Sequence, residues 1–499
     1  MMKRKLIYSM FAVSLLGVVG CGDDFLEPER NTQTLTEQDL ADNIVNNPKL
    51  ADGTLNGLYS YMITPGAGGT TDHDDFGQKA VDIWSDMLSG DMALQNNVYN
   101  WYGGWTNLQP TVDYTQRQNR TVWGYYFNII RGANGLIANA GGNDIVPDDA
   151  TARHNLGQAK ALRAYGYFYL TQLFQRGYTP AQPILPLYTT PGLPAGPKVP
   201  ASEIYALIVK DLTDAVTLLE GYDRGVVKQK INKPVAQGLL AYTYAAMGQY
   251  DQVKTITDDI IANSGNPLTT AAQTAGAGAG FNNVATASWM WGYNLNAELG
   301  IDLISWWGQV DIFTYSYAGA GDRKVIDNLL FSKIPVGDIR RNQFQPSGTF
   351  AGMPVNKFFH SGRVQNGQRN IDSDYIYMRV DEFYLLNAEA SAKLGQDGDA
   401  KTRMSQLLAL RMGSVAAANA YLAPLSAQAL QDAIYLQTRI ELWGEGKSYF
   451  ALKRNKAMMT RGTNHFYQAG LSIPYDDDRL TLQIPISEMN NNSNITEQN

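Results

Sequence analysis

Residues 234–261, PVAQGLLAYTYAAMGQYDQVKTITDDII, have the pattern of two helices joined by a tight turn. Pro234 fits the first turn of a helix, because its fixed φ and missing N–H are tolerated there. We expect this helix to run to Met247 and to end at Gly248, and a second helix to run from Asp251 to Ile261. The segment therefore predicts a pair of adjacent antiparallel helices.

A second stretch repeats this plan. Asn387–Ala390, Gly395 and Ala400 precede a further helix that we expect to reach Met412. Both copies resemble a tetratricopeptide repeat, with small residues where the helices touch and a glycine at the turn. Helical periodicity also marks 159–174 and 204–219. We therefore expect a mainly α fold with a tetratricopeptide-like helical-repeat scaffold; unrelated antiparallel helices are the alternative.

Between the two copies, the helical periodicity is lost. Residues 264–377 hold an Ala/Gly tract at 275–280, with scattered aromatic, glycine and proline residues. Loops that a rigid scaffold supports are frequent places for binding function. We expect one domain over 41–499, in which the scaffold (about 41–263 and 378–455) carries a large loop-rich ligand-binding insertion (about 264–377).

The amino-terminal region has the pattern of an export signal. A basic start is followed by the apolar run Leu6–Val19 and then by Cys21, the only cysteine of the chain. Leu16–Cys21 resembles the lipobox of bacterial lipoproteins, so we expect a signal peptide at 1–20, lipidation of Cys21 and a tether over 21–40. No later apolar stretch is long enough to span a bilayer, which predicts membrane attachment through the lipid alone. A buried Cys21 thiol is the alternative.

Composition narrows the class of partner. The net charge is -7 and only 17% of residues are charged, which argues against nucleic acid. Aromatic residues reach 11%, and most of the remaining polarity comes from uncharged side chains. Such a surface suits an uncharged polar ligand such as a sugar. No pattern indicates a cofactor.

Several segments, in this order along the chain, resemble the SusD/RagB family of outer-membrane nutrient-binding lipoproteins. They are Asp24–Glu27, Trp123–Asn134, Ala159–Tyr165, Asp338–Arg341, Met378–Leu385 with Ala388–Ala390, Arg439–Gly446 and Ile484–Glu488. Two positions depart from the family pattern: Ala451 stands where an Asp is frequent, and the chain ends at Glu497–Asn499 without Gly-Tyr.

The resemblance implies a SusD-like α-superhelical fold and a lipoprotein on the outer membrane, facing the cell surface. It also implies that the protein binds oligosaccharide and delivers it to a TonB-dependent outer-membrane transporter, the SusC-like partner, over which it sits as a lid. Some members bind oligopeptides instead, so that ligand class stays open. The resemblance implies no catalytic residue.

Two tryptophan clusters are the candidate ligand contacts, because sugar rings lie against flat aromatic rings. They are Trp101 and Trp105, and Trp289, Trp291, Trp306 and Trp307. If Trp306 and Trp307 lie in a strand, their rings point to opposite faces, so at most one contacts ligand. Asp322 is a candidate for hydrogen bonds to hydroxyl groups. Core packing is the alternative for any single ring.

Other charged residues have structural interpretations. Asp72–Asp75 is acidic enough to suggest a cation, but adjacent side chains cannot all face one ion, and we expect a solvated loop without metal. Arg and Glu on packed helices more often pair with each other than catalyse. We therefore predict structural roles for Arg379, Glu382, Glu389, Arg439, Glu441 and Glu445.

Two other function classes compete with a glycan-binding protein. A secreted glycoside hydrolase needs two carboxyl groups at a defined separation, and no pair stands out in the sequence. A helical-repeat adaptor that binds only protein has no use for a long irregular insertion rich in Trp and Gly. Incubation with a glycan panel separates the three, because an enzyme forms product, a binder retains glycan and an adaptor does neither.

Overall fold

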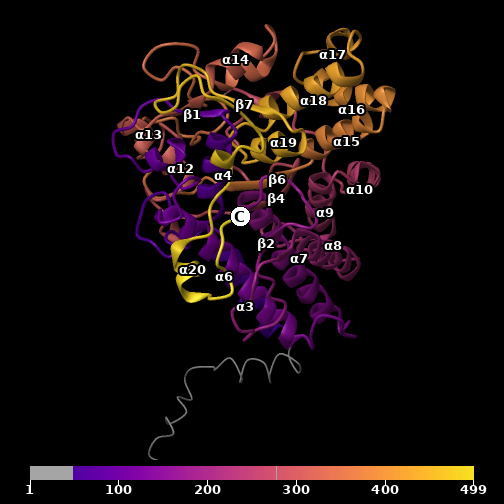
Figure 1. Cartoon of the computed structure of the whole chain (residues 1–499). Coiled ribbons are helices and arrows are strands. Elements are labelled where there is room, and N and C mark those ends of the chain that lie inside the picture. Colours follow the sequence, from indigo (N-terminus) through magenta and orange to yellow (C-terminus); the bar gives the residue numbers. More distant parts are fainter. Residues whose placement is uncertain (1–48, 277) are drawn as a thin grey trace, which may run out of the picture. The chain divides into compact units, whose positions relative to one another are not determined.

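The computed structural model describes residues 49–276 and 278–499, and these residues are mainly helical, as predicted (Figure 1). The longer helices are α3 (Leu50–Tyr61), α4 (Gln78–Leu88), α6 (Arg117–Asn139), α7 (Ala150–Phe174), α8 (Ala201–Leu218), α9 (Lys233–Met247), α10 (Tyr250–Asn263), α15 (Asp381–Lys393), α16 (Asp397–Ala409), α17 (Val415–Leu422) and α18 (Ala427–Glu441). The predicted signal peptide, Cys21 and the tether lie outside the described residues.

The shorter elements fill the connections. The short helices are α5 (Gly103–Thr106), α11 (Ala271–Thr274), α12 (Trp306–Val310), α13 (Tyr317–Ala320), α14 (Asn328–Lys333), α19 (Ser448–Arg454) and α20 (Ile486–Asn491), with 3-10 turns η2 (Ala297–Leu299), η3 (Ile339–Gln343) and η4 (Asp478–Leu480). The strands form antiparallel pairs: β1 (Met92–Leu94) with β5 (Lys324–Ile326), β2 (Pro183–Leu185) with β3 (Val199–Pro200), β4 (Trp289–Tyr293) with β6 (Tyr375–Arg379), and β7 (Met458–Thr460) with β8 (Ser472–Pro474).

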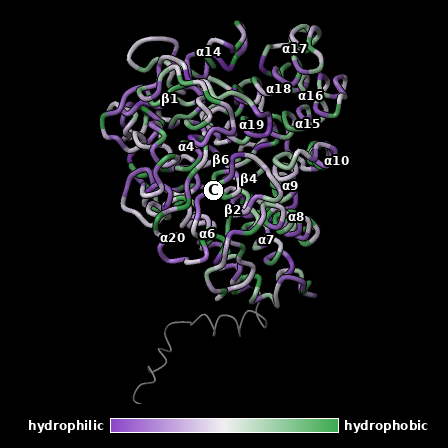
Figure 2. Tube along the Cα trace, viewed as in Figure 1, coloured by the Kyte–Doolittle hydropathy of each residue, from purple (hydrophilic) through white to green (hydrophobic). Residues whose placement is uncertain are grey.

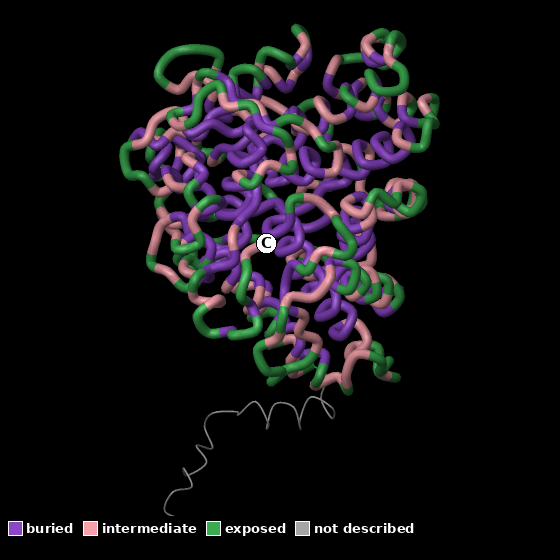
Figure 3. The backbone as a smooth tube through the Cα atoms, in the orientation of Figure 1, coloured by how far each residue is buried: buried purple, intermediate pink, exposed green. Residues whose placement is uncertain are grey.

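The scaffold is a row of helices in which neighbours in sequence are neighbours in space. Helices α6 to α10 pack consecutively, and α15, α16 and α17 continue in the same way. Helix α10 packs on α15 although the whole insertion separates them in the chain (Figure 1). Most of the long helices carry both hydrophobic and hydrophilic residues, and the buried residues lie mainly in the interior of the described part of the chain (Figures 2 and 3).

Glycine ends both predicted repeat helices. Gly248 follows α9 with φ 75°, and Gly395 follows α15 with φ 74°. A side chain strains the backbone in this left-handed region, so glycine is favoured at such a turn. Pro234 lies in the first turn of α9, where Asn232 accepts a hydrogen bond from the Val235 backbone N–H. The predicted helix pair at 234–261 is therefore confirmed.

The segment between α10 and α15 is irregular but anchored at both ends. None of its described helices is longer than six residues. Strand β4 pairs with β6 directly before α15, and β5 pairs with β1 from the amino-terminal half. The loops after β1 therefore lie beside the insertion, which brings two distant parts of the chain to one face.

Trp306 and Trp307 do not lie in a strand. They begin α12, because the Ser305 hydroxyl accepts the Gly308 backbone N–H at 3.0 Å and caps the first turn. Across 49–276 and 278–499, every helix is too short or too polar to cross a bilayer.

Candidate functional site

Three loop regions that are far apart in the sequence bring five aromatic side chains together in one surface, which we call the aromatic face. Its members are His73, Tyr99, Trp101, Tyr315 and Tyr317. The His73 and Trp101 rings are stacked, with centroids 4.7 Å apart and an interplanar angle of 8°. Tyr317 meets Tyr99 edge-on at 5.0 Å and Trp101 at 6.1 Å. The aromatic face thus joins a residue before α4, residues before α5 and residues at α13.

The rings of the aromatic face differ in exposure. Tyr99 is 52% exposed and Tyr315 is 43% exposed, whereas Trp101 and His73 are half-buried. Tyr317 is buried beneath them, and its hydroxyl hydrogen-bonds the His73 ring. Flat rings that are partly exposed and held from below are suited to stacking against a flat, weakly polar ligand.

Buried polar groups fix the loops that carry these rings. Asp322 accepts hydrogen bonds from the backbone N–H groups of Val98 and Tyr99, the latter at 2.9 Å. The Gln309 side chain donates to the His73 carbonyl at 2.8 Å. Because Asp322 and Gln309 are fully buried, the aromatic face is held in place by the protein itself.

Polar and charged groups lie at the edge of the aromatic face. The Arg369 guanidinium lies over the Tyr315 ring, 4.6 Å from its centroid, and pairs with Asp302 at 3.1 Å. Burial lowers the pKa of His73 and outweighs the opposing effect of Asp72. His73 is therefore neutral at pH 7, and its ring presents a hydrogen-bonding edge without charge.

Most of the predicted tryptophan contacts are core residues, which corrects the sequence-based expectation. Trp105, Trp289, Trp291, Trp306 and Trp307 are all between 1% and 4% exposed. The Trp105 indole N–H donates to Asp74 at 2.6 Å, and that of Trp291 donates to the Gln229 carbonyl at 2.9 Å. Of the six predicted rings, only Trp101 reaches the surface.

Asp322 is also not a ligand contact, because it is 1% exposed and its carboxylate accepts hydrogen bonds from backbone N–H groups. Its role is to position the loop that carries Tyr99 and Trp101. Of the predicted tryptophans, Trp101 is therefore part of the aromatic face. The others pack in the core.

The acidic loop at 72–75 is not the solvated segment that the sequence predicts. Asp74 and Asp75 are each 2% exposed. Asp74 pairs with Arg117 at 3.0 Å, and Asp75 accepts the Gly68 backbone N–H at 2.8 Å. Burial raises the pKa of Asp74 despite the nearby Arg117 guanidinium. Within 49–276 and 278–499, no group of three or more His, Cys, Asp and Glu side chains is arranged to hold a metal ion.

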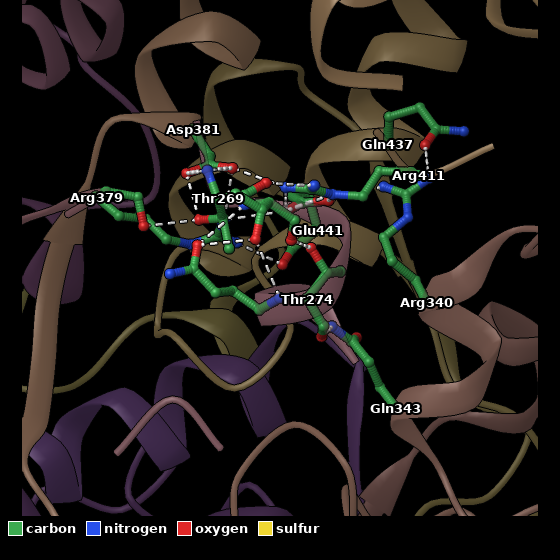
Figure 4. Close-up of polar contacts among 12 residues, drawn as sticks. Thr269, Thr274, Arg340, Gln343, Arg379, Asp381, Arg411, Gln437 and Glu441 are labelled. Atoms are coloured by element: carbon green, nitrogen blue, oxygen red, sulfur yellow. Dashed lines mark hydrogen bonds and ion pairs between the residues drawn. The ribbon is translucent and has the colours of Figure 1, made fainter. Parts of the chain in front are cut away.

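A second polar cluster lies in the core, where the scaffold meets the insertion (Figure 4). Glu441 at the end of α18 contacts three guanidinium groups: Arg411 at 2.8 Å, Arg379 at 2.9 Å and Arg340 at 3.1 Å. Arg379 and Arg411 also share Asp381, at 3.0 and 2.7 Å. Every one of these side chains is at most 2% exposed.

Arg379 and Glu441, for which we predicted structural roles, are paired with each other in this buried cluster. Burial alone raises the pKa of Glu441, but Arg411, Arg379 and Arg340 outweigh it and hold the pKa well below the usual value. A general acid needs a proton near neutral pH, which Glu441 lacks. The other charged residues with predicted structural roles are paired as well: Glu445 with Arg379, Glu389 with Arg454 and Arg439 with Asp91. Glu382 accepts from the Tyr242 hydroxyl at 2.7 Å.

Sequence reasoning based on tryptophan missed four of the five members of the aromatic face. A usable signal is the alternation of aromatic residues in loops, as in Tyr99 with Trp101 and Tyr315 with Tyr317. Such spacing places two rings close together in extended chain. The pairing of these two segments, however, depends on the contact between β1 and β5.

Comparisons with known proteins agree with this architecture. A model described as the SusD family matches residues 281–499, and one described as "Starch-binding associating with outer membrane" matches 29–245. A SusD-like carbohydrate binding protein from Bacteroides vulgatus superposes with TM-score 0.73 at 24% identity, covering 89% of this chain and 96% of that chain. A search of curated protein sequences finds no match.

Two further solved structures share the fold. A SusD superfamily protein from Bacteroides fragilis has TM-score 0.72 and 20% identity, covering 91% of this chain and 100% of that chain. Surface glycan-binding protein A from Bacteroides thetaiotaomicron, solved in complex with laminarihexaose, has TM-score 0.67 and 14% identity, with coverage of 90% and 99%. These similarities show a common fold.

Proposed function

The chain belongs to the SusD family, and from that premise we propose that it binds oligosaccharide on the aromatic face without turning it over. The observation that carries the proposal is the set of partly exposed rings, Tyr99, Trp101 and Tyr315, held by buried polar groups. A structure of similar fold was solved with laminarihexaose, which supports a glycan as the ligand class. A rigid aromatic surface loses little conformational entropy when a glycan binds, so more of the interaction free energy remains as binding affinity.

We further propose that the protein is a lipoprotein anchored through Cys21 on the outer membrane, where it passes glycan to a TonB-dependent SusC-like transporter. The export pattern before Cys21 and the family membership support this location. The alternative ligand within the family is an oligopeptide. A glycoside hydrolase needs a carboxyl group that keeps a proton near neutral pH, and arginines hold the pKa of Glu441 and of Glu445 below its usual value.

Replacing Trp101 or Tyr99 with Ala is expected to weaken glycan binding by about tenfold, equivalent to about 1.4 kcal/mol. Each change removes a stacking surface, and the stability of the fold changes little because neither side chain lies in the core. Isothermal titration with a glycan panel that includes laminarihexaose measures the affinity, and product analysis measures turnover. Tyr114→Ala is the control, since Tyr114 is 39% exposed and lies outside the aromatic face.

Unchanged affinity in both variants would place the site elsewhere. Release of shorter glycans from the panel would identify an enzyme, and retention of oligopeptides alone would favour the alternative ligand.

Cys21→Ala is expected to move the protein from the membrane fraction to the soluble fraction. Acyl chains hold the protein at a bilayer because each buried CH₂ contributes about 0.8 kcal/mol. Fractionation followed by immunoblotting measures the distribution, with Ser9→Ala in the expected signal as control. A Cys21→Ala protein that still sediments with membranes contradicts the anchor.

A further inference from the structure

A cavity of about 800 Å³ opens on the helical scaffold, and none of its lining residues belongs to the aromatic face. It lies where the carboxyl ends of α7, α9, α15 and α19 meet. The lining is basic: it contains Arg176, Lys393, Lys453, Arg454 and Lys456. Asp476 is the one acidic residue among the described lining residues. The volume of the cavity lies within the usual range of about 300–1,000 Å³ for small-ligand sites.

Two of the five cations are neutralised by the protein. Arg454 pairs with Glu389 at 2.7 Å, and Arg176 pairs with Asp478. For Lys393 and Lys456, the described part of the chain provides no hydrogen-bond or ion-pair partner. These two lysines therefore leave an excess of positive charge in the lining of the cavity.

Lys453 lies deeper and has no carboxylate partner. It is 6% exposed, and its ammonium group donates to the carbonyls of Gln172 and Gln175 just before and after the end of α7. Burial lowers the pKa of Lys453 to about 7. A buried ammonium without a counter-ion is costly, so an anion in the cavity is favourable.

The carboxyl ends of the helices account for part of this charge. Helix ends bear partial negative charge, and lysines near them are favourable. That explains the two carbonyl contacts of Lys453. Arg454 is paired with Glu389, but its Nη1 has no hydrogen-bond partner although the residue lines the cavity.

We propose that this cavity binds the carboxylate of an acidic sugar unit. A carboxylate accepts charge-assisted hydrogen bonds from the ammonium groups of Lys393, Lys453 and Lys456, which line the cavity. Tyr178, Tyr250 and Tyr475 also line the cavity and offer rings against which a sugar packs. The cavity volume of about 800 Å³ suits a small acidic sugar better than a folded partner. This site is separate from the aromatic face and extends the ligand range beyond neutral glycan.

The test is titration of the full-length protein with trigalacturonate and, as the uncharged match, galactotriose. We expect trigalacturonate to bind and galactotriose to bind at least about tenfold more weakly, with trigalacturonate affinity falling as salt rises. The double variant Lys393→Ala, Lys456→Ala is expected to weaken trigalacturonate binding by about tenfold. Lys456 is exposed and Lys393 is half-buried, and neither side chain has a hydrogen-bond or ion-pair partner among the described residues, so we expect the variant to retain the fold; circular dichroism verifies this. Lys333→Ala, an exposed lysine on α14, is the matched control.

Trp101→Ala separates this site from the aromatic face. Retained trigalacturonate binding in Trp101→Ala, together with loss in the double lysine variant, supports the cavity. Equal affinity for both trisaccharides, no change in the double variant, or loss in Trp101→Ala alone overturns the proposal. Binding of triglutamate without trigalacturonate also overturns it, because the cavity then takes acidic peptide. None of these results depends on whether neutral glycan binds the aromatic face.

Discussion

Glu441→Gln is expected to lower the free energy of unfolding by about 3–5 kcal/mol, the usual cost of removing one partner of a buried ion pair. The carboxylate lies between Arg411, Arg379 and Arg340, each within 3.1 Å. The amide keeps the shape of the side chain but places N–H donors against guanidinium donors. The three buried guanidinium groups then lose the negative charge that Glu441 supplied. The contact between α18 and the insertion is weakened as a result.

Urea unfolding followed by tryptophan fluorescence measures this loss. Glu220→Gln is the matched control, because Glu220 pairs with Lys233 at 2.5 Å but is 69% exposed. Exposed pairs contribute about 0–1 kcal/mol, so the control is expected to resemble the wild type. Equal small losses in both variants would show that the buried cluster does not stabilise the fold.

The difference between wild type and Glu441→Gln is also expected to depend on pH. The folded-state pKa of Glu441 is depressed, so its ionised form stabilises the protein above the unfolded-state value of about 4.3. That contribution is lost as the pH falls through the folded-state pKa, because the protonated acid resembles the amide. The two unfolding curves therefore converge in acid and separate toward neutral pH. A constant difference from pH 7 down to the lowest pH at which both proteins fold contradicts this electrostatic account.

Trp306→Ala is expected to lower the free energy of unfolding by about 3–5 kcal/mol, as for other large-to-small changes of buried aromatic residues. The Trp306 ring is 1% exposed, contacts Phe358 edge-on at 5.2 Å and lies 4.2 Å from the Lys79 ammonium group. Removing it leaves a cavity that the capped, short helix α12 cannot close. Tyr315 and Tyr317 of the aromatic face lie on the same insertion as Trp306, and their positions depend on the fold of that insertion. We therefore expect glycan binding to fall only under conditions in which the protein begins to unfold.

Thermal and urea unfolding on Trp306→Ala and Trp101→Ala distinguish core from surface with the same chemical change. Trp101→Ala is expected to lose affinity and keep stability, whereas Trp306→Ala is expected to do the reverse. A stable Trp306→Ala protein that selectively loses glycan would restore the sequence-based expectation that this ring contacts ligand.

The sequence alone predicted the features that depend on local chemistry. The turn at Gly248 follows from the left-handed backbone that glycine favours, and the helices on either side follow from their apolar periodicity. The structural roles of Glu441 and Arg379 were also predictable, because charged residues on packed helices persist only with partners, whereas the contacts of Glu441 with Arg340 and Arg411 were not predicted.

Only the tertiary structure decided which aromatic rings face solvent. Trp101 and Trp105 lie four residues apart, yet one ring reaches the surface and the other donates to Asp74 in the core. The sequence does not distinguish them, because the burial of each ring depends on segments far away in the chain. The aromatic face forms where β1 pairs with β5 and brings Tyr99 against Tyr317, and the buried Asp322 carboxylate then fixes that contact. Long-range strand pairing and side-chain packing, rather than local propensity, therefore placed the site.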